Sequence, residues 1–258
     1  IGAGMINKVS ICVPAWSYYG YGHTLIEDLF NSLKKQTNQS YEVIISDQSQ
    51  DNKIKKVCDQ YSSDPDGMDI KHNFFDPSYS HLVNYLNAEK YATGSIIKPL
   101  FQPDFISCET FIDKVIKTHT ENEMSWVLYR FNHCDWDRSS FFNEMVPKYN
   151  SNLVVGVNTI GAPSNCSFSA DIKERIDENL QMLSDCDHYF RLYQSYGPPV
   201  VVDDMCYITN RVSDKEAKNE SKVTSKIPFD INYVIDKHNL KNNDITNINA
   251  SPFAMYIK

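Results

Sequence analysis

Three glycine-containing motifs of common enzyme classes are missing from this 258-residue sequence. No G-x-G-x-x-G follows the first predicted strand, which counts against a dinucleotide-binding unit. No glycine-rich loop ends in Lys, as a P-loop NTPase requires, and no G-x-S-x-G forms the nucleophile elbow of a hydrolase. The chemistry must therefore depend on other residues.

An excess of positive charge and long apolar runs are also missing. The net charge of −8 counts against a general nucleic-acid binder, which needs a basic face. No apolar run approaches the roughly 20 residues that span a bilayer, so we expect only peripheral membrane contact or contact through a partner. The seven cysteines lack zinc-ribbon spacing, which predicts a reducing, cytoplasmic location, including the inner face of a membrane.

Strand and helix patterns alternate in the first hundred residues. The first strand is expected to end at Pro14, and Thr24 with Glu27 forms a capping-box pattern that opens the first helix. The alternation predicts an α/β fold with a mostly parallel central sheet flanked by helices. The predicted strands are 9–13, 41–46, 68–72 and the run from Gly94, and the helices are 24–33, 52–61 and 80–91.

The second half is less regular, and we expect one domain over 5–212. Residues 1–4 precede Met5 and resemble a cloning remnant. The polar stretch 213–258 is predicted to pack on or cover the domain. Expected elements are helices 107–119, 172–183 and 185–196, strands 125–131, 154–160 and 200–209, and a long loop over 132–152.

Polar and aromatic residues stand where the buried strands end. Asp104 closes the apolar run GSIIKPLFQPDF, and ligands gather at the carboxyl ends of parallel strands. Trp16 can stack on a planar base, and Asp47 can accept the N–H of that base. Alternatively, Trp16 packs on the core and Asp47 caps a helix. The residues alone leave both interpretations open.

Five blocks, in order, resemble the inverting glycosyltransferases of family 2, in the WcaA-like bacterial or viral branch. They are VSICVPAWS, LFNSLKKQT, IISDQSQD, YLNAEKYATG and the stretch around LSDCDHYFRL. The resemblance runs from Val9 to about Arg211. It implies the GT-A nucleotide-sugar-binding fold.

The resemblance also implies a donor site. Residues aligned with the nucleotide-sugar contacts of the family are Pro14, Ala15, Trp16, Asp47, Ser49, Asn87 and Gln102. Asp104 falls at the metal motif and would hold Mn²⁺ or Mg²⁺, although Pro103 replaces a carboxylate and Ser213 replaces a His. One carboxylate can hold such a cation with waters and phosphate oxygens. Alternatively, Asp104 caps the helix expected near Ser107.

On the acceptor side, Asp185 falls at the general base of the family, which removes the proton of the attacking hydroxyl. Its alternative role is a helix N-cap. Asp187 and Arg191 follow on the same helix, where Arg191 can instead pair with a nearby carboxylate. Gly161 and Ala162 lie in a loop that resembles the border of the acceptor pocket.

The resemblance implies a hexosyltransferase-type enzyme of polysaccharide biosynthesis. It would move a sugar, with inversion, from a nucleotide-diphosphate sugar such as a UDP-sugar to a hydroxyl of a glycan or glycolipid. Two alternatives remain: a catalytically degenerate nucleotide- or glycan-binding module, favoured by Pro103 and Ser213, and a GT-A-like nucleotidyltransferase. The nucleotidyltransferase is the weaker of these, because the first loop, SYYGYGH, is not basic.

Overall fold

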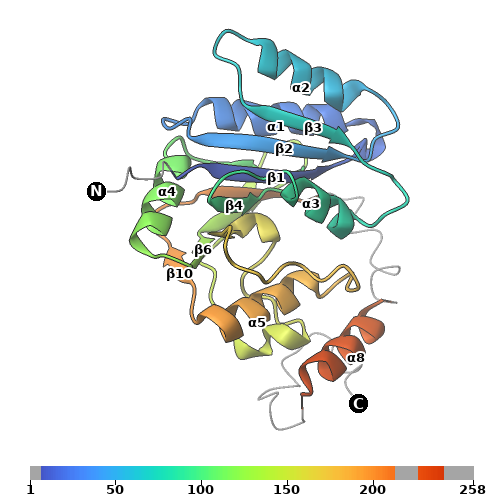
Figure 1. Ribbon diagram of the computed structural model, residues 1–258, viewed down its shortest axis with the longest axis vertical. Coiled ribbons are helices and arrows are strands. Elements are labelled where there is room, and N and C mark those ends of the chain that lie inside the picture. The colour runs from blue at the N-terminus through green and yellow to red at the C-terminus, as the bar shows by residue number, and fades with distance from the viewer. Residues whose placement is uncertain (1–6, 213–225, 241–258) are drawn as a thin grey trace.

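The computed structural model describes residues 7–212 and 226–240 (Figure 1). The predicted remnant 1–4 and Ser213 lie outside the described residues. The first half alternates strand and helix, as predicted. Its elements are β1 (Val9–Ala15), α1 (Gly22–Lys34), β2 (Tyr41–Asp47), α2 (Lys53–Ser63), β3 (Ile70–Phe74), α3 (His81–Glu89) and β4 (Ile96–Pro99).

The main sheet has seven strands in the order β10-β6-β9-β4-β1-β2-β3. Its other strands are β6 (Trp126–Tyr129), β9 (Cys166–Ser169) and β10 (Val200–Val202). Only β9 runs antiparallel to its neighbours, β4 and β6, among the described strands of this sheet. The prediction of a mostly parallel central sheet flanked by helices is confirmed.

Helices cover both faces of this sheet (Figure 1). Val9, Ile11 and Val13 of β1 pack with α1, α2 and α4 (Phe111–Glu121), whereas Cys12 packs with α3 and α5 (Ser184–Tyr196). Successive side chains of a strand point to opposite faces, so a strand buried on both faces is mostly apolar along its length. This is why β1 and β2 were visible as continuous apolar runs.

A second, four-stranded sheet has the order β5-β11-β7-β8. Its strands are β5 (Phe105–Ile106), β7 (Phe131–Cys134), β8 (Phe141–Met145) and β11 (Ile208–Arg211). The expected loop over 132–152 is therefore wrong, because it contains most of the β7–β8 hairpin. All five residues of β8 are exposed, so this strand carries no hydrophobic period. The expected strands 125–131 and 200–209 are each divided between the two sheets.

Two further predictions in the second half are wrong. Residues 154–160 form no strand; η2 (Ser151–Val155) is a 3-10 helix that ends at Gly156 in the left-handed conformation, φ 88°. Residues 172–183 form no helix, although their buried apolar residues have helical spacing. The N–H groups of residues 181–183 donate to the Asp230 carboxylate, so they make no helical bonds.

Smaller differences concern the ends of elements. β1 continues through Pro14, because β4 pairs with β1 only as far as Cys12. Beyond Cys12 only β2 pairs with β1, and a strand with one free side tolerates proline. α1 begins at Gly22 after Tyr21, so the capping box at Thr24 does not form. α8 (Ile227–His238) follows later in the chain. Within the described ranges, no helix has both the length and the apolar character to cross a bilayer.

Candidate functional site

A cavity of about 560 Å³ lies at the carboxyl ends of β1 and β4, bordered by the small sheet. The loops that follow β1, β2 and β4 meet there because parallel strands end at one edge of the sheet. Five predicted site residues line it: Pro14, Trp16, Gln102, Asp104 and Ala162. The other lining residues are Tyr18, Gln48, His81, Asn84, Phe101, Pro103, His133, Asn210, Arg211 and Val212.

Gln102 holds the loop that carries Trp16. Its Oε1 accepts the Trp16 N–H at 2.9 Å, and its Nε2 donates to the carbonyls of Trp16 (3.0 Å) and Gly22 (2.8 Å). A Cβ on Gly22 would lie 2.1 Å from the Trp16 carbonyl oxygen, so only glycine allows this approach. Gln102 is 2% exposed and therefore acts mainly as a support for the cavity rim.

Aromatic rings form the rim of the cavity. Trp16 is 38% exposed, and its ring centroid lies 4.9 Å from that of Tyr18. The Tyr18 ring stacks on Trp136, with 5.3 Å between the ring centroids and 20° between the ring planes. Tyr18 and Tyr19 have φ of 47° and 56°, a conformation that side chains other than glycine rarely adopt. This rim joins the loop after β1 to the β7–β8 hairpin. Sequence reasoning missed Trp136 because it lies in the expected loop.

Four of the predicted nucleotide contacts lie outside the cavity wall. Asp47 is fully buried, with its Oδ2 3.0 Å from His72 Nε2 and its Oδ1 accepting the Ser49 N–H. It caps no helix, because α2 has Asn52 as its N-cap. Asn87 donates to Ser46 Oγ at 2.8 Å. Ala15, Asp47, Ser49 and Asn87 therefore lie behind the cavity, and Gln48 replaces Asp47 on its wall.

Asp104 is 5% exposed and accepts the Arg211 N–H at 3.2 Å. Burial raises the pKa of Asp104 to about 6, against smaller opposing effects of Ser164, Arg211, Asn210 and the charge on Lys98. The helix-cap alternative is wrong, because α4 begins at Phe111 after Thr110. Asp104 is thus a carboxylate of raised proton affinity on the cavity wall.

Lys98 is a fully buried amine that supports this wall. Its Nζ donates to the carbonyls of Pro99 (2.8 Å), Cys166 (3.2 Å) and Ser164. Burial lowers the pKa of Lys98 to about 7. Ser164 Oγ accepts the Phe101 N–H at 3.0 Å, which ties the loop after β4 to the loop of Ala162. A lysine inside the apolar run GSIIKPLF is the sequence signal that indicates this contact.

Asn210 supplies a side-chain amide to the cavity. It is 7% exposed, and neither its Oδ1 nor its Nδ2 makes a hydrogen bond of regular geometry, although the amide lies near enough to Asp104 to lower the pKa of that carboxyl. Buried polar groups are nearly always paired, so this amide fits a ligand. The described residues contain no group of three His, Cys, Asp or Glu side chains arranged for a metal. Asp104 and Asn210 Oδ1 nevertheless fit part of the oxygen shell of a hard cation completed by water and phosphate.

Asp185, a partly buried residue in the first turn of α5, is not among the residues that line the cavity and is linked to the Ala162 loop through Asn158. Its Oδ2 accepts from Asn158 Nδ2 and its Oδ1 from the Cys186 N–H, both at 2.8 Å. Asn158 Oδ1 in turn accepts the Gly161 N–H at 2.8 Å. Burial raises the pKa of Asp185 to about 6. Leu183, and not Asp185, is the N-cap of α5, so the capping alternative is wrong.

Asp187 and Arg191 are not among the lining residues. Asp187 is fully buried and accepts from Arg191 Nε (2.8 Å), Lys237 Nζ (2.9 Å) and His238 Nε2 (2.7 Å). Burial alone would raise the pKa of Asp187, but the His238 hydrogen bond and the Arg191 and Lys237 charges hold it well below its usual range. The alternative that Arg191 pairs with a nearby carboxylate is what the structure shows.

No protein-family model and no curated protein matches this chain. Solved structures of S. aureus TarS are similar in fold. TarS 1–349 in complex with UDP superposes with a TM-score of 0.62 at 18% identity, covering 86% of this chain and 65% of that chain. A longer TarS chain superposes with a TM-score of 0.64 at 17% identity, covering 95% of this chain and 40% of that chain. TarS 1–349 in complex with UDP-GlcNAc superposes with a TM-score of 0.62 at 17% identity, covering 80% of this chain and 59% of that chain.

The chain thus spans between 40% and 65% of the length of these TarS chains. The likeness confirms the predicted GT-A fold. It gives no support to the WcaA-like branch. Because identity is below one residue in five, the roles of individual residues rest on the geometry of the cavity.

Proposed function

We propose that the chain is an inverting glycosyltransferase that uses a nucleotide-diphosphate sugar, most simply a UDP-sugar. One observation carries the proposal: a single cavity combines the exposed ring of Trp16 with Asp104, the side-chain amide of Asn210 and the cationic Arg211. An aromatic rim suits a base, and a wall of this kind suits a diphosphate. TarS, which has the same fold, holds UDP and UDP-GlcNAc in its structures.

In the proposal, Trp16 stacks on the base and Arg211 faces the diphosphate. Arg211 is partly neutralised by Asp28 at 2.8 Å, and its Nε is unpartnered. A divalent cation, where bound, would be held by Asp104 and Asn210 Oδ1 and would neutralise charge on the leaving diphosphate. Arg211 could supply part of the same stabilisation, so a requirement for metal is a separate question from transfer.

Asp185 acts as the general base. With a pKa of about 6 it is ionised above that pH and basic enough to take the proton of an acceptor hydroxyl. The hydroxyl oxygen attacks the anomeric carbon, the bond to the diphosphate breaks and UDP leaves. A single displacement inverts that carbon. The Asn158–Gly161 contact ties the base to the loop of Ala162, which we assign to the acceptor side.

The finer assignments belong to the same proposal. They are a hexosyl donor, a glycan or glycolipid acceptor in polysaccharide biosynthesis, and a cytoplasmic site of action with peripheral membrane contact. The domain division is also proposed, with catalysis in 5–212 and an added segment in 213–258. The wall residues Asp104 and Arg211 and the base Asp185 all fall within 5–212.

A degenerate binding module is the second candidate, favoured by Pro103, because Asp104 is then the only carboxylate among the described residues that line the cavity. Two measurements on the same protein separate the two functions. A transferase shows a thermal shift with UDP and also releases UDP from a UDP-sugar, with water or a glycan as acceptor. A binding module shows the thermal shift alone, and neither function survives if UDP causes no shift.

A further inference from the structure

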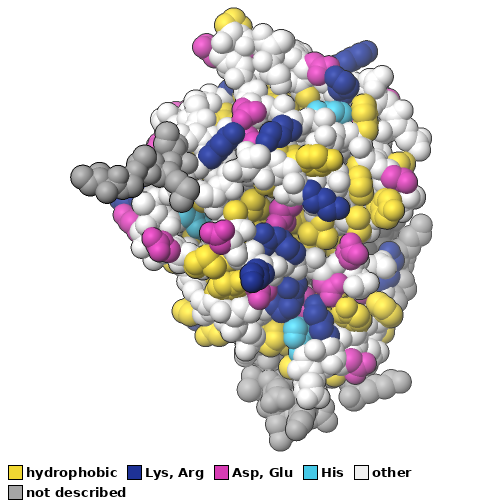
Figure 2. Space-filling model, in the orientation of Figure 1, with side chains coloured by type: hydrophobic (Ala, Val, Ile, Leu, Met, Phe, Trp, Pro, Cys, Tyr) yellow, Lys and Arg dark blue, Asp and Glu magenta, His cyan; other side chains and the backbone are white. Residues whose placement is uncertain are grey.

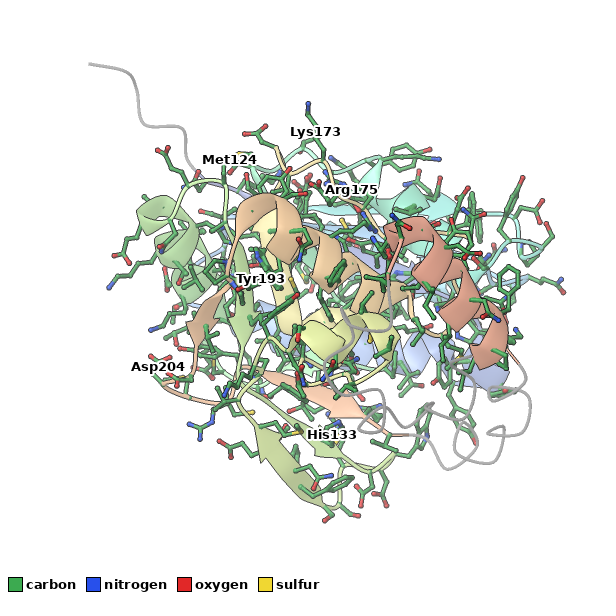
Figure 3. The ribbon with its side chains drawn as sticks, turned by 90° about the horizontal axis from the view of Figure 1, so that it is seen from below. Met124, His133, Lys173, Arg175, Tyr193 and Asp204 are labelled. Atoms are coloured by element: carbon green, nitrogen blue, oxygen red, sulfur yellow. The ribbon has the colours of Figure 1, made fainter. Side chains whose placement is uncertain are left out.

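α8 packs against the segment that leads into α5. Its apolar side chains Ile227, Ile231 and Val234 are buried, packing with Leu183 and with Val154, Val155 and Leu180. Figure 3 shows α8 beside the end of α5 that lies away from Tyr193. This is the end that carries Asp185 in its first turn. α8 therefore contacts α5 where the proposed base is located.

Asp230 makes the first polar contact between the two. It is fully buried, and its Oδ2 accepts the N–H groups of Gln181 (2.9 Å), Met182 (2.6 Å) and Leu183 (3.0 Å). The first N–H groups of a helix and the turn before it lack partners of their own. A carboxylate there also interacts favourably with the positive end of the helix dipole. The N-cap residue Leu183 makes no side-chain cap of its own, and Asp185 accepts only the Cys186 N–H further into the turn, so Asp230 satisfies the N–H groups that precede it.

Lys237 and His238 make the second contact, on the other side of Asp185. Both donate to Asp187, at 2.9 and 2.7 Å, and Lys237 also reaches Asp177 at 2.7 Å. Arg191 of α5 completes the charges around Asp187. Figure 2 shows Lys and Arg beside Asp and Glu on the face where α5 and α8 meet. Asp185 thus lies between two points that α8 holds in place.

We propose that α8 positions the general base through Asp230, Lys237 and His238, which we name the α8 contacts. The inference rests on the proposed function. In the part of the chain that the structure describes, the Asp185 carboxylate accepts from Asn158 Nδ2 and from the adjacent Cys186 N–H. Helix ends open more readily than helix centres, and a displacement of about 1 Å at a reacting group can lower a rate about 100-fold. The α8 contacts keep this first turn closed.

The test compares Asp230→Asn with Asp236→Asn. Asp236 is an exposed carboxylate on α8 and serves as the matched control. Three quantities are measured: amide hydrogen exchange over residues 181–188, the dissociation constant for UDP, and kcat for donor turnover. In Asp230→Asn we expect faster exchange confined to 181–188, an unchanged UDP constant and a kcat lower by about tenfold or more. The control should match wild type in all three.

The outcomes separate this inference from the proposed function. Unchanged exchange in Asp230→Asn, or faster exchange with an unchanged kcat, overturns the positioning role. A matching loss of UDP binding assigns Asp230 a general structural role and also overturns it. If wild-type protein turns over no donor, the proposed function fails first, and no base remains to be positioned. Should Asp230→Asn not fold, His238→Ala removes one contact to Asp187 and is judged by the same readouts.

Discussion

The substitution Asp185→Asn should abolish transfer and, at alkaline pH, stabilise the fold. Burial raises the pKa of this carboxyl from 3.8 to about 6, so the folded protein binds the proton more tightly than the unfolded chain. The ionised carboxylate therefore destabilises the fold. This cost is absent below about pH 4, grows between the two pKa values and is complete above pH 6.

The size of the effect follows from the shift. A change of about two pKa units corresponds to about 3 kcal/mol at pH 8, at 1.36 kcal/mol for each unit. The introduced amide nitrogen would face Asn158 Nδ2, and losing that hydrogen bond costs about 1 kcal/mol. The net gain is roughly 2 kcal/mol, or a Tm higher by about 4–8 °C for a chain of this size. At pH 4 the gain should vanish.

The assay records Tm at pH 8 and pH 4 for wild type, Asp185→Asn and Asp187→Asn. Asp187 is the matched control, because its pKa is held low, so its ionised form stabilises the fold above pH 4. Asp187→Asn should lower Tm at pH 8 and have less effect as the pH falls toward the folded pKa. A lower Tm for Asp185→Asn at both pH values would refute the assignment of Asp185 as a buried carboxylate whose ionised form destabilises the fold.

The remaining predictions concern the donor. Trp16→Ala should weaken UDP binding by roughly 5- to 100-fold, since base stacking contributes about 1–3 kcal/mol. Tyr21→Ala is the control, because Tyr21 is exposed and does not line the cavity. Equal loss of UDP binding in both variants would exclude stacking on Trp16. UDP should raise the Tm of wild type more with Mn²⁺ than with EDTA, and this difference should disappear in Asp104→Asn, as calorimetry or dye-based melting can record. Equal shifts for wild type in both conditions would mean that Asp104 holds no metal.

The first half of the fold could be predicted because its strands are buried on both faces. Continuous apolar runs marked β1 and β2, and the rule that parallel strands end at one edge placed Trp16 and Asp104 together. The small sheet could not be predicted in the same way. Its strand β8 is exposed throughout, and β7 and β11 line the cavity with His133 and Asn210 instead of alternating apolar residues.

Contacts between residues far apart in the chain explain the other differences. Asp47 lies at the end of a strand, as predicted, but its carboxylate is hydrogen-bonded to His72 of the neighbouring strand. Asp230 accepts three N–H groups 47 to 49 residues away, which therefore make no helical bonds at the end of the segment 172–183 that apolar spacing predicts to be a helix. No local pattern records such pairings, because each depends on the folded arrangement.

The central claim is that this cavity transfers a sugar with Asp185 as the base. The most direct measurement is UDP release from a panel of UDP-sugars at pH 8 by wild type and Asp185→Asn, with donor binding measured on the same samples. We predict that wild type releases UDP from at least one donor. Asp185→Asn should bind this donor equally well but release UDP at a rate at least about 100-fold lower. Equal release by both proteins, or no binding of any donor by wild type, would contradict the claim.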